Sequence, residues 1–329
     1  DRVARELRLF LREVNAAPGV IQFPDWETLP YDSFSPHQDI ISERMRCLYQ
    51  LASGEKTIVI VAASTLMHHL PPHDYIVGQS LVLKLQQKLS RDAFAQQLSM
   101  AGYYSVDTVF QHGEFALRGS LIDVFPMGSN SAYRIELFDD EVESLRAFDP
   151  ETQRTIEQVK QIELLPGREC PVDDEAIATF KENWYENFDV DAKSCPVFID
   201  TIEGHAHAGI EYYLPLFFKQ TANFFDFVPE QSLVLMFDGF NQAIEDFYRE
   251  TLKRFEDRSF DIERPLLKPA LAFHSVNALF AAANEFPRIS LFKEKIEDKA
   301  GQTNYPFSEL PNIQIDSKAQ CPCISWKTF

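Results

Sequence analysis

The run TIVIVAA at residues 57–63 decides the fold class, because it consists of β-branched and small apolar residues with no polar alternation. Such a run is typical of a strand that is buried on both faces of a parallel sheet. Amphipathic helical patterns at residues 2–15 and 40–51 and a short strand at residues 20–23 precede it, and a further helix is expected to start at residue 64. The order helix, strand, helix, strand, helix predicts an α/β fold.

The pattern changes near residue 80, where short strands separated by Gly and Ser/Asn turns begin. Residues 133–138 (YRIELF) alternate polar and apolar side chains, as expected of a half-exposed strand. We therefore predict a small α+β domain at residues 80–166, inserted between two α/β parts at 1–79 and 167–302, with a linker or tail at 303–329. The other predicted elements are strands at 80–85, 108–110, 121–125, 232–237 (buried) and 288–292, and helices at 90–100, 173–188, 241–257 and from 276.

Acidity pervades the chain, whose 329 residues carry a formal net charge of −19. Basic and acidic side chains number 7 and 10 in residues 1–79, 8 and 13 in 80–166, and 16 and 27 in 167–329, so the net charges are −3, −5 and −11. This excludes a protein that coats nucleic acid by bulk charge. Because the chain starts at Asp1 inside a helical pattern, we expect its natural start to lie upstream.

The predicted location is the cytoplasm, with no membrane partner. No apolar run approaches the roughly 18 residues of a membrane span, and no signal peptide opens the chain. The five cysteines are an odd number and fit reduced thiols. The C-P-C of Cys321 and Cys323 has poor spacing for zinc.

Motifs for catalysis are missing from the sequence. The nearest approach to a P-loop, GEKT at residues 54–57, lacks the first glycine and precedes a strand instead of following one. The acidic runs at 139–141 and 173–175 are interpreted as a turn and a helix start, and His68, His69 and His73 as part of a solvated loop. We expect no catalytic residue, no cofactor, no metal site and no enzyme activity of the chain itself.

Arg118, Arg134 and Phe138 stand out within the acidic segment 80–166. On neighbouring antiparallel strands, two arginines and an aromatic residue can share one exposed face, and such a set is typical of an interface anchor. The alternative is that the arginines pair with Glu114 and Glu136 and that the Phe belongs to the core. Chemistry alone favours this alternative, because exposed Arg–carboxylate pairs are common.

Two pairs of segments carry a family resemblance. Residues 24–32 (PDWETLPYD) and 35–44 (SPHQDIISER) resemble the N-terminal region of the bacterial transcription-repair coupling factors, the Mfd family. Residues 113–126 (GEFALRGSLIDVFP) and 134–141 (RIELFDDE) are similar to the block that this family shares with the excision-repair protein UvrB. The resemblance extends over residues 1 to about 300.

The resemblance implies that the two α/β parts form one degenerate helicase-like domain, and that the insert binds UvrA, the damage-recognition ATPase. Residue by residue, Arg118, Arg134 and Phe138 fall on the UvrA-contacting positions of the family. Full-length members are ATP-driven DNA translocases that displace stalled RNA polymerase. RNA polymerase and double-stranded DNA are therefore implied as partners of domains outside this chain, and a C-terminal domain of the full-length protein is implied to mask the UvrA surface.

A different hypothesis is a module that binds DNA directly or hydrolyses nucleotide. Its candidate stacking residues are Tyr103, Tyr104, Trp26 and Tyr31, none of which lies in a basic hairpin. Salt-dependent DNA binding or an ATPase rate above background would favour it. A third possibility is that the α/β parts only brace the rest of a longer protein.

Overall fold

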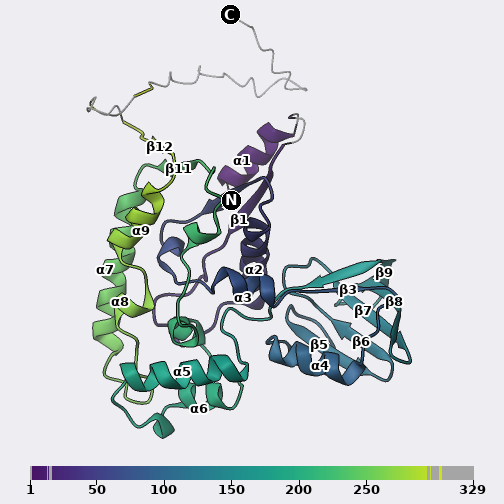
Figure 1. Cartoon of the computed structure of the whole chain (residues 1–329). Helices are drawn as coiled ribbons and strands as arrows, with labels where there is room; N and C mark the ends of the chain where they lie inside the picture. The colour runs from purple at the N-terminus through teal and green to yellow at the C-terminus, as the bar shows by residue number, and fades with distance from the viewer. Residues whose placement is uncertain (1, 13, 15–16, 295–296, 298–303, 306–329) are drawn as a thin grey trace, which may run out of the picture.

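The computed structural model describes residues 2–12, 14, 17–294, 297, 304 and 305. It is a mixed α/β structure with several sheets. Figure 1 shows a tall body made by both ends of the chain and a β-rich lobe that projects from one side of it. The predicted tail, with Cys321 and Cys323, falls outside the described residues except for Asn304 and Tyr305.

The first sheet consists of the parallel strands β1 (Gly19–Phe23) and β2 (Thr57–Val61), which α2 (Gln38–Ala52) connects. Together with α1 (Arg2–Leu11), they confirm the predicted order of the first elements. The expected burial of the second strand on both faces is wrong, since all five residues of β2 are partly exposed. Within the described residues this sheet has no third strand, so β2 has a strand beside it on one edge only.

No α-helix begins at residue 64, contrary to the prediction. A single 3₁₀ turn, Thr65–Met67, is followed by extended chain in which His68 and Leu70 form bridges to two later segments. Helix α3 (His73–Gly78) begins only after two prolines. Proline disfavours the helical conformation of the residue before it, which explains the delay.

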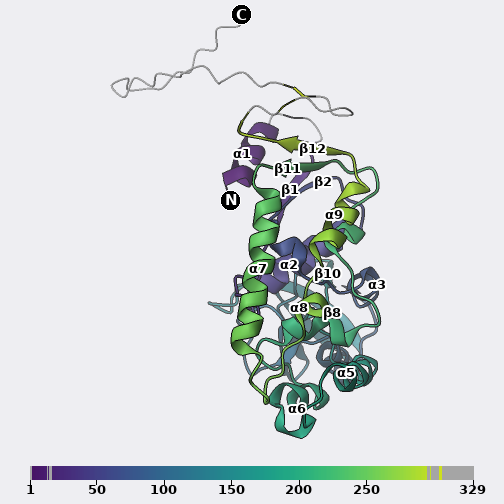
Figure 2. The same cartoon turned by 90° about the vertical axis from the view of Figure 1, so that its left-hand side faces the viewer.

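The second α/β part follows the lobe in the chain. Helices α5 (Asp174–Asn187) and α7 (Phe240–Arg258) confirm the predictions, and Figure 2 shows α7 along one side of the body. Strands β11 (Val234–Phe237) and β12 (Arg288–Leu291) pair in parallel, but the predicted burial of β11 is wrong, since Leu235 is 52% exposed. The other elements are α6 (Pro196–Ile202), α8 (Pro269–Ala272), α9 (Val276–Asn284) and the 3₁₀ turns Ala192–Ser194, Ile210–Phe217 and Phe224–Phe227.

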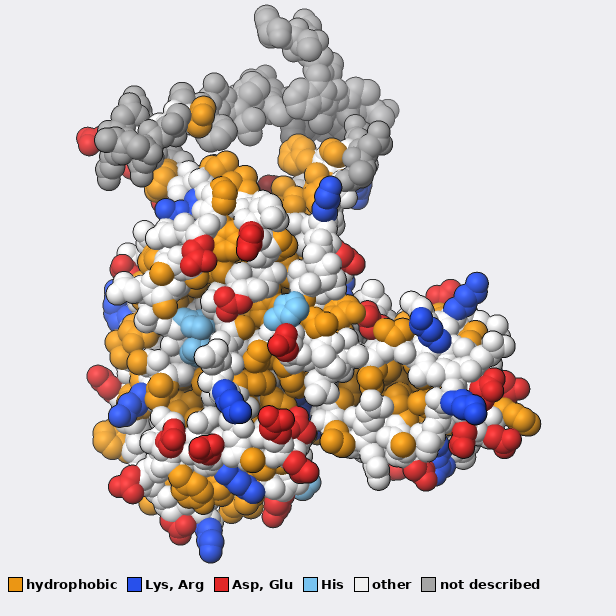
Figure 3. Space-filling model, viewed as in Figure 1, with side chains coloured by type: hydrophobic (Ala, Val, Ile, Leu, Met, Phe, Trp, Pro, Cys, Tyr) orange, Lys and Arg blue, Asp and Glu red, His pale blue; other side chains and the backbone are white. Residues whose placement is uncertain are grey.

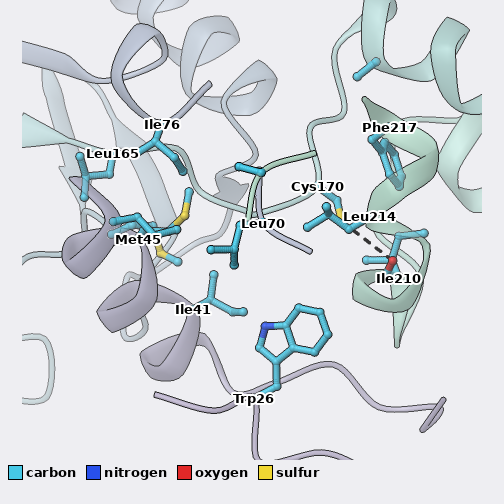
Figure 4. Packing of buried hydrophobic residues seen from close by; sticks show 14 of the residues in the cluster. Trp26, Ile41, Met45, Leu70, Ile76, Leu165, Cys170, Ile210, Leu214 and Phe217 are labelled. Carbon is cyan, nitrogen blue, oxygen red and sulfur yellow. Dashed lines mark hydrogen bonds between the residues drawn. The ribbon is translucent and has the colours of Figure 1, made fainter. Parts of the chain in front are cut away.

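One hydrophobic core joins both parts of the body to the neck of the lobe, which is the place where the chain enters the lobe near residue 80 and leaves it near residue 166. Figure 4 shows Trp26 and Met45 from the first part around the same core as Leu214 and Phe217 from the second, with Leu165 from the neck. None of these side chains is more than 4% exposed. Burial of this size is the main favourable term in folding, so the two ends of the chain stabilise each other.

A six-stranded sheet in the order β4-β5-β6-β7-β8-β9 forms the lobe. Helix α4 (Arg91–Met100) covers one face of it, and β3 (Leu81–Lys84) pairs antiparallel with β10 (Gln161–Leu164) at the neck. The six strands are β4 (Tyr104–Ser105), β5 (Glu114–Arg118), β6 (Leu121–Val124), β7 (Ala132–Phe138), β8 (Glu141–Phe148) and β9 (Thr155–Gln158).

The strand predicted at residues 108–110 is wrong, because this segment is irregular. Val109 is fully buried in a second, smaller core with Phe125 and Phe148, on the face of the sheet opposite α4. The guanidinium group of Arg118 holds the segment by donating a hydrogen bond to the backbone oxygen of Asp107. Residues 106–112 therefore cover part of the sheet instead of extending it.

Candidate functional site

Two tight hairpins set the register of the lobe's sheet. Gly119 and Ser120 connect β5 to β6, and Gly119 has φ +60°. A two-residue loop with a left-handed first residue matches the twist of the strands, and glycine adopts that conformation without a steric penalty. Asp139, with φ +52°, and Asp140 form the turn between β7 and β8, confirming the turn predicted there.

The strand pairing places Arg118, Arg134 and Phe138 on one face of the sheet. Asp123 of β6 lies opposite Arg134 of β7 and opposite Ala116 of β5, so Arg134 and Arg118 point to the same side. Phe138 lies four residues after Arg134 on the same strand and projects to that side as well. We call this side, opposite α4, the outer face.

Arg134 is firmly held within the outer face. Its Nε and Nη2 donate to Oδ1 and Oδ2 of Asp123, both at 2.7 Å, and its guanidinium carbon lies 4.8 Å from the ring centre of Phe148. The side chains of Arg134 and Asp123 are only 18% and 2% exposed. Hydrogen bonding to Asp123 raises the pKa of Arg134. A planar bidentate pair of this kind fixes the guanidinium group, so little of it faces solvent.

Arg118 has a looser environment than Arg134. Its guanidinium group donates to the backbone oxygen of Asp107 at 2.7 Å and to the hydroxyl of Thr108 at 2.8 Å. Both ion pairs described on the outer face involve other arginines. The charge of Arg118 is therefore available to a carboxylate of a partner, which an arginine can bind with two parallel hydrogen bonds.

Phe138 is 67% exposed at the end of β7. Exposed acidic side chains follow it directly at Asp139, Asp140 and Glu141. Figure 3 shows acidic side chains gathered at the free end of the lobe, close to Lys and Arg side chains. An exposed aromatic ring beside charged groups has the composition of an interface anchor.

The alternative interpretation, in which Glu114 and Glu136 pair with the two arginines, is wrong in its partners. Glu114 accepts hydrogen bonds from the backbone N–H groups of residues 110 and 111. Glu136 instead forms an ion pair with Arg146 of β8. The exposure of Phe138 also contradicts its assignment to the core.

Two residues of the outer face, Asp123 and Arg146, were not predicted from the sequence. Asp123 is the single charged residue in the strand LIDV at residues 121–124 and is 1% exposed. A charge in such a run is a signal for a buried ion pair, because an unpaired buried carboxylate is strongly unfavourable. Arg146 carries no comparable signal, since its strand alternates as an ordinary half-exposed strand does.

A buried polar cluster joins the two parts of the body just after the chain leaves the lobe. Nε of Arg44 donates to Oε1 of Glu169 at 2.6 Å, and Nε1 of Trp26 donates to Oε2 at 2.9 Å. Both charged side chains are at most 1% exposed. Beside the cluster, Gly167 lies against Gly102 so closely that an added Cβ would be 2.7 Å from the Gly102 carbonyl carbon. These contacts hold the chain at the point where it leaves the lobe.

A small cavity of about 60 Å³ with mixed polar and apolar lining lies at the same junction, and Gln38, Arg168 and Glu211 are among its lining residues. Ser35 Oγ donates to the Glu211 carboxyl group at 2.9 Å. Burial raises the pKa of Glu211 to about 7, so this group carries a proton for part of the time near neutral pH.

Two of the three histidines that the sequence placed in a solvated loop, His68 and His69, are largely buried, whereas His73 at the start of α3 is exposed. His68 is 3% exposed, and its ring meets Trp26 edge-on with ring centres 4.3 Å apart. The ring of His69 lies 3.9 Å from that of His274. Desolvation lowers the pKa of both His68 and His69 to about 3, so both are neutral at pH 7. Among the described residues, no three His, Cys, Asp or Glu side chains group as a metal site requires.

Most of the aromatic residues considered for nucleic-acid stacking lie in the core. Trp26, Tyr31 and Tyr103 are 3%, 1% and 4% exposed, and a buried ring cannot stack on a base. Tyr104 is 40% exposed, but the guanidinium carbon of Arg168 lies 4.1 Å from the centre of its ring. No helix in the described part of the chain has the length and apolar character to cross a membrane.

Comparison with known proteins agrees with the family resemblance. Residues 81–169 match the family model of the UvrB interaction domain. The chain is 43% identical over 311 residues, 94% of its length, to the transcription-repair-coupling factor of Escherichia coli K12, and 39% identical over all 329 residues to that of Haemophilus influenzae Rd. It spans 27% and 29% of the length of these two relatives. The chain therefore belongs to the transcription-repair-coupling factor family and corresponds to its N-terminal UvrB-homology region.

Proposed function

We propose that the chain recruits UvrA in transcription-coupled nucleotide excision repair, and that UvrA binds the outer face of the inserted sheet. The observation that carries the proposal is the placement of Arg118, Arg134 and Phe138 on one face, within the segment that matches the UvrB interaction domain. Arginines bind carboxylates in planar geometry, and a neighbouring aromatic ring excludes water from such pairs. The partner surface is accordingly acidic.

The body of the chain acts in this proposal as a scaffold without catalysis of its own. Its two α/β parts make one degenerate helicase-like domain, which is supported by the single core that they share. ATP-driven translocation on double-stranded DNA and the displacement of RNA polymerase are assigned to other parts of the longer protein. An ATPase rate of this chain above background would contradict the scaffold role.

UvrA binding by single-residue variants tests the proposal. Purified cognate UvrA is titrated onto the immobilised chain, and Arg118→Glu and Phe138→Ser are each expected to weaken binding at least ten-fold, about 1.4 kcal/mol. Lys84→Glu, which reverses an exposed charge on β3 outside the six-stranded sheet, is the matched control and is expected to bind normally. Unchanged UvrA binding by Arg118→Glu, with its circular dichroism spectrum intact, would contradict the proposal.

A further inference from the structure

Arg146 lies directly opposite Arg134 on the outer face, one strand further from Arg118. Directly opposed residues of antiparallel strands have Cβ atoms about 5 Å apart, and like charges at that distance destabilise a sheet. The pair is tolerated because each arginine has a carboxylate on the neighbouring residue of the same face. Asp123 pairs with Arg134, and Glu136 pairs with Arg146.

The two carboxylates hold their arginines very differently. Asp123 is buried and binds Arg134 through both oxygens. Glu136 has a side chain that is 36% exposed, contacts only Nη2 of Arg146, and also accepts a hydrogen bond from Ser144 Oγ at 3.0 Å. Nε of Arg146 is shielded from solvent yet has no hydrogen-bond partner among the described residues. Arg146 is therefore the arginine of this pair that is free to change its partner.

The outer face also concentrates positive charge on an acidic lobe. Arg118, Arg134 and Arg146 stand on β5, β7 and β8, and the two ion pairs described among them use Asp123 and Glu136. Two further carboxylates, Glu114 on β5 and Glu141 at the start of β8, lie on the same side of the sheet outside this group. Three of the 8 basic side chains of residues 80–166 thus stand on this one face, although the segment carries 13 acidic side chains. An acidic segment of a partner is therefore attracted to the part of the face that carries these three arginines.

We infer that Arg146 is a further partner-contacting residue, which exchanges Glu136 for a carboxylate of the bound partner. The inference rests on the proposed UvrA-binding function and extends the contact surface across β8. One internal ion pair is broken and one is formed with the partner, while Glu136 keeps Ser144 and gains water at its exposed position. Arg134 stays on Asp123 and acts mainly as a positioning residue for the face.

Two neutral variants separate this exchange from a merely structural ion pair. Arg146→Gln removes the contacting charge and is expected to weaken binding of purified cognate UvrA about ten-fold. Glu136→Gln removes the competing carboxylate and is expected to strengthen binding about three-fold, because Arg146 is then free and the face is more positive. A purely structural pair predicts no gain in affinity from Glu136→Gln. Lys84→Gln, which removes one exposed positive charge of the same lobe, is the matched control.

Arg118→Glu, measured in parallel, distinguishes this inference from the function on which it depends. If Arg118→Glu loses binding while Arg146→Gln and Glu136→Gln both stay within two-fold of the control, the inference is overturned and the function stands. If Arg118→Glu also binds normally, the proposed function itself is overturned. Should Arg146→Gln unfold the lobe, the affinity of Glu136→Gln decides, and an unchanged or weaker value rejects the exchange.

Discussion

Removing Arg134 is expected to destabilise the whole lobe, not only its contact with a partner. Arg134→Met leaves the Asp123 carboxylate, 2% exposed, without its bidentate partner. Breaking a buried ion pair from one side costs about 3–5 kcal/mol, because an uncompensated charge remains inside. Loss of the cation 4.8 Å from the Phe148 ring centre adds about 0.5–1 kcal/mol. Folded domains have about 5–15 kcal/mol of stability in total, so this single change removes a large share.

A second variant shows whether the ion pair is the cause. Asp123→Val combined with Arg134→Met removes both charges, and apolar replacement of a whole buried pair is often close to neutral. We expect the double variant to recover at least about 2 kcal/mol relative to Arg134→Met alone. Urea unfolding followed by circular dichroism gives the free energies, and hydrogen exchange of the β6 and β7 amides shows whether the loss is local to the lobe.

Either of two results would contradict a stabilising buried pair of Asp123 and Arg134. In the first, Arg134→Met lowers the free energy of unfolding by less than about 1 kcal/mol, the range of an exposed pair. In the second, the double variant loses as much stability as Asp123→Val and Arg134→Met lose when their separate effects are added. The expected result also bears on binding experiments. Arg134→Glu sets a second carboxylate against Asp123, so a loss of UvrA binding by that variant has to be corrected for unfolding.

Three further predictions concern stability. Arg118 has an exposed side chain without an internal carboxylate partner, so Arg118→Glu is expected to change the unfolding free energy by no more than about 0.5 kcal/mol. A loss above about 2 kcal/mol in urea would show instead that its hydrogen bonds to residues 107 and 108 stabilise the fold. Glu211 has a pKa raised from 4.5 to about 7, so its neutral form favours folding, and this stability is complete below about pH 4.5 and is lost as the pH rises through 7. Glu211→Gln is therefore expected to have the same free energy of unfolding as the parent chain near pH 4.5 and a value up to about 3 kcal/mol higher at pH 8.5. A difference in thermal unfolding that does not change with pH would contradict this. Gly167→Ala places a Cβ 2.7 Å from the Gly102 carbonyl carbon and is expected to lower the free energy of unfolding in urea by about 1–3 kcal/mol. Gly78→Ala is the control, because an added Cβ there has no atom within 4 Å. Equal stability of the two variants would refute the close fit at the neck.

Local patterns in the sequence predicted the elements better than their surroundings. The β-branched run at 57–63 indicated a strand, because the preference of such residues for extended chain is local. Its burial depended on neighbours in the sheet, and β2 has only β1 beside it among the described residues. His68 shows the opposite error. Two prolines close by indicated a loop, but packing against Trp26 and Phe273, far away in the sequence, buries its ring.

The outer face was predictable only in part, for the same physical reason. Alternation along one strand puts Arg134 and Phe138 on one side, and this needs no knowledge of the neighbouring strands. Which carboxylate meets which arginine depends on register, and a shift by one residue would turn Asp123 to the other face. The two-residue turns at Gly119 and Asp139 set that register. The partners Glu114 and Glu136 were chosen without it and were wrong.

Register also ranks residues that the family resemblance treats alike. Arg118 reaches only a backbone oxygen and a hydroxyl, whereas Arg134 neutralises a buried carboxylate. Reversing Arg118 therefore alters the charge that a partner meets, while reversing Arg134 also removes part of what holds β6 to β7. A double variant that reverses the charge of both Arg118 and Arg134 therefore combines a loss of partner contact with a loss of folding stability. The two single reversals differ by several kcal/mol in their effect on folding. Binding energy on this face is best assigned from Arg118, Phe138 and Arg146, whose substitutions leave Asp123 paired.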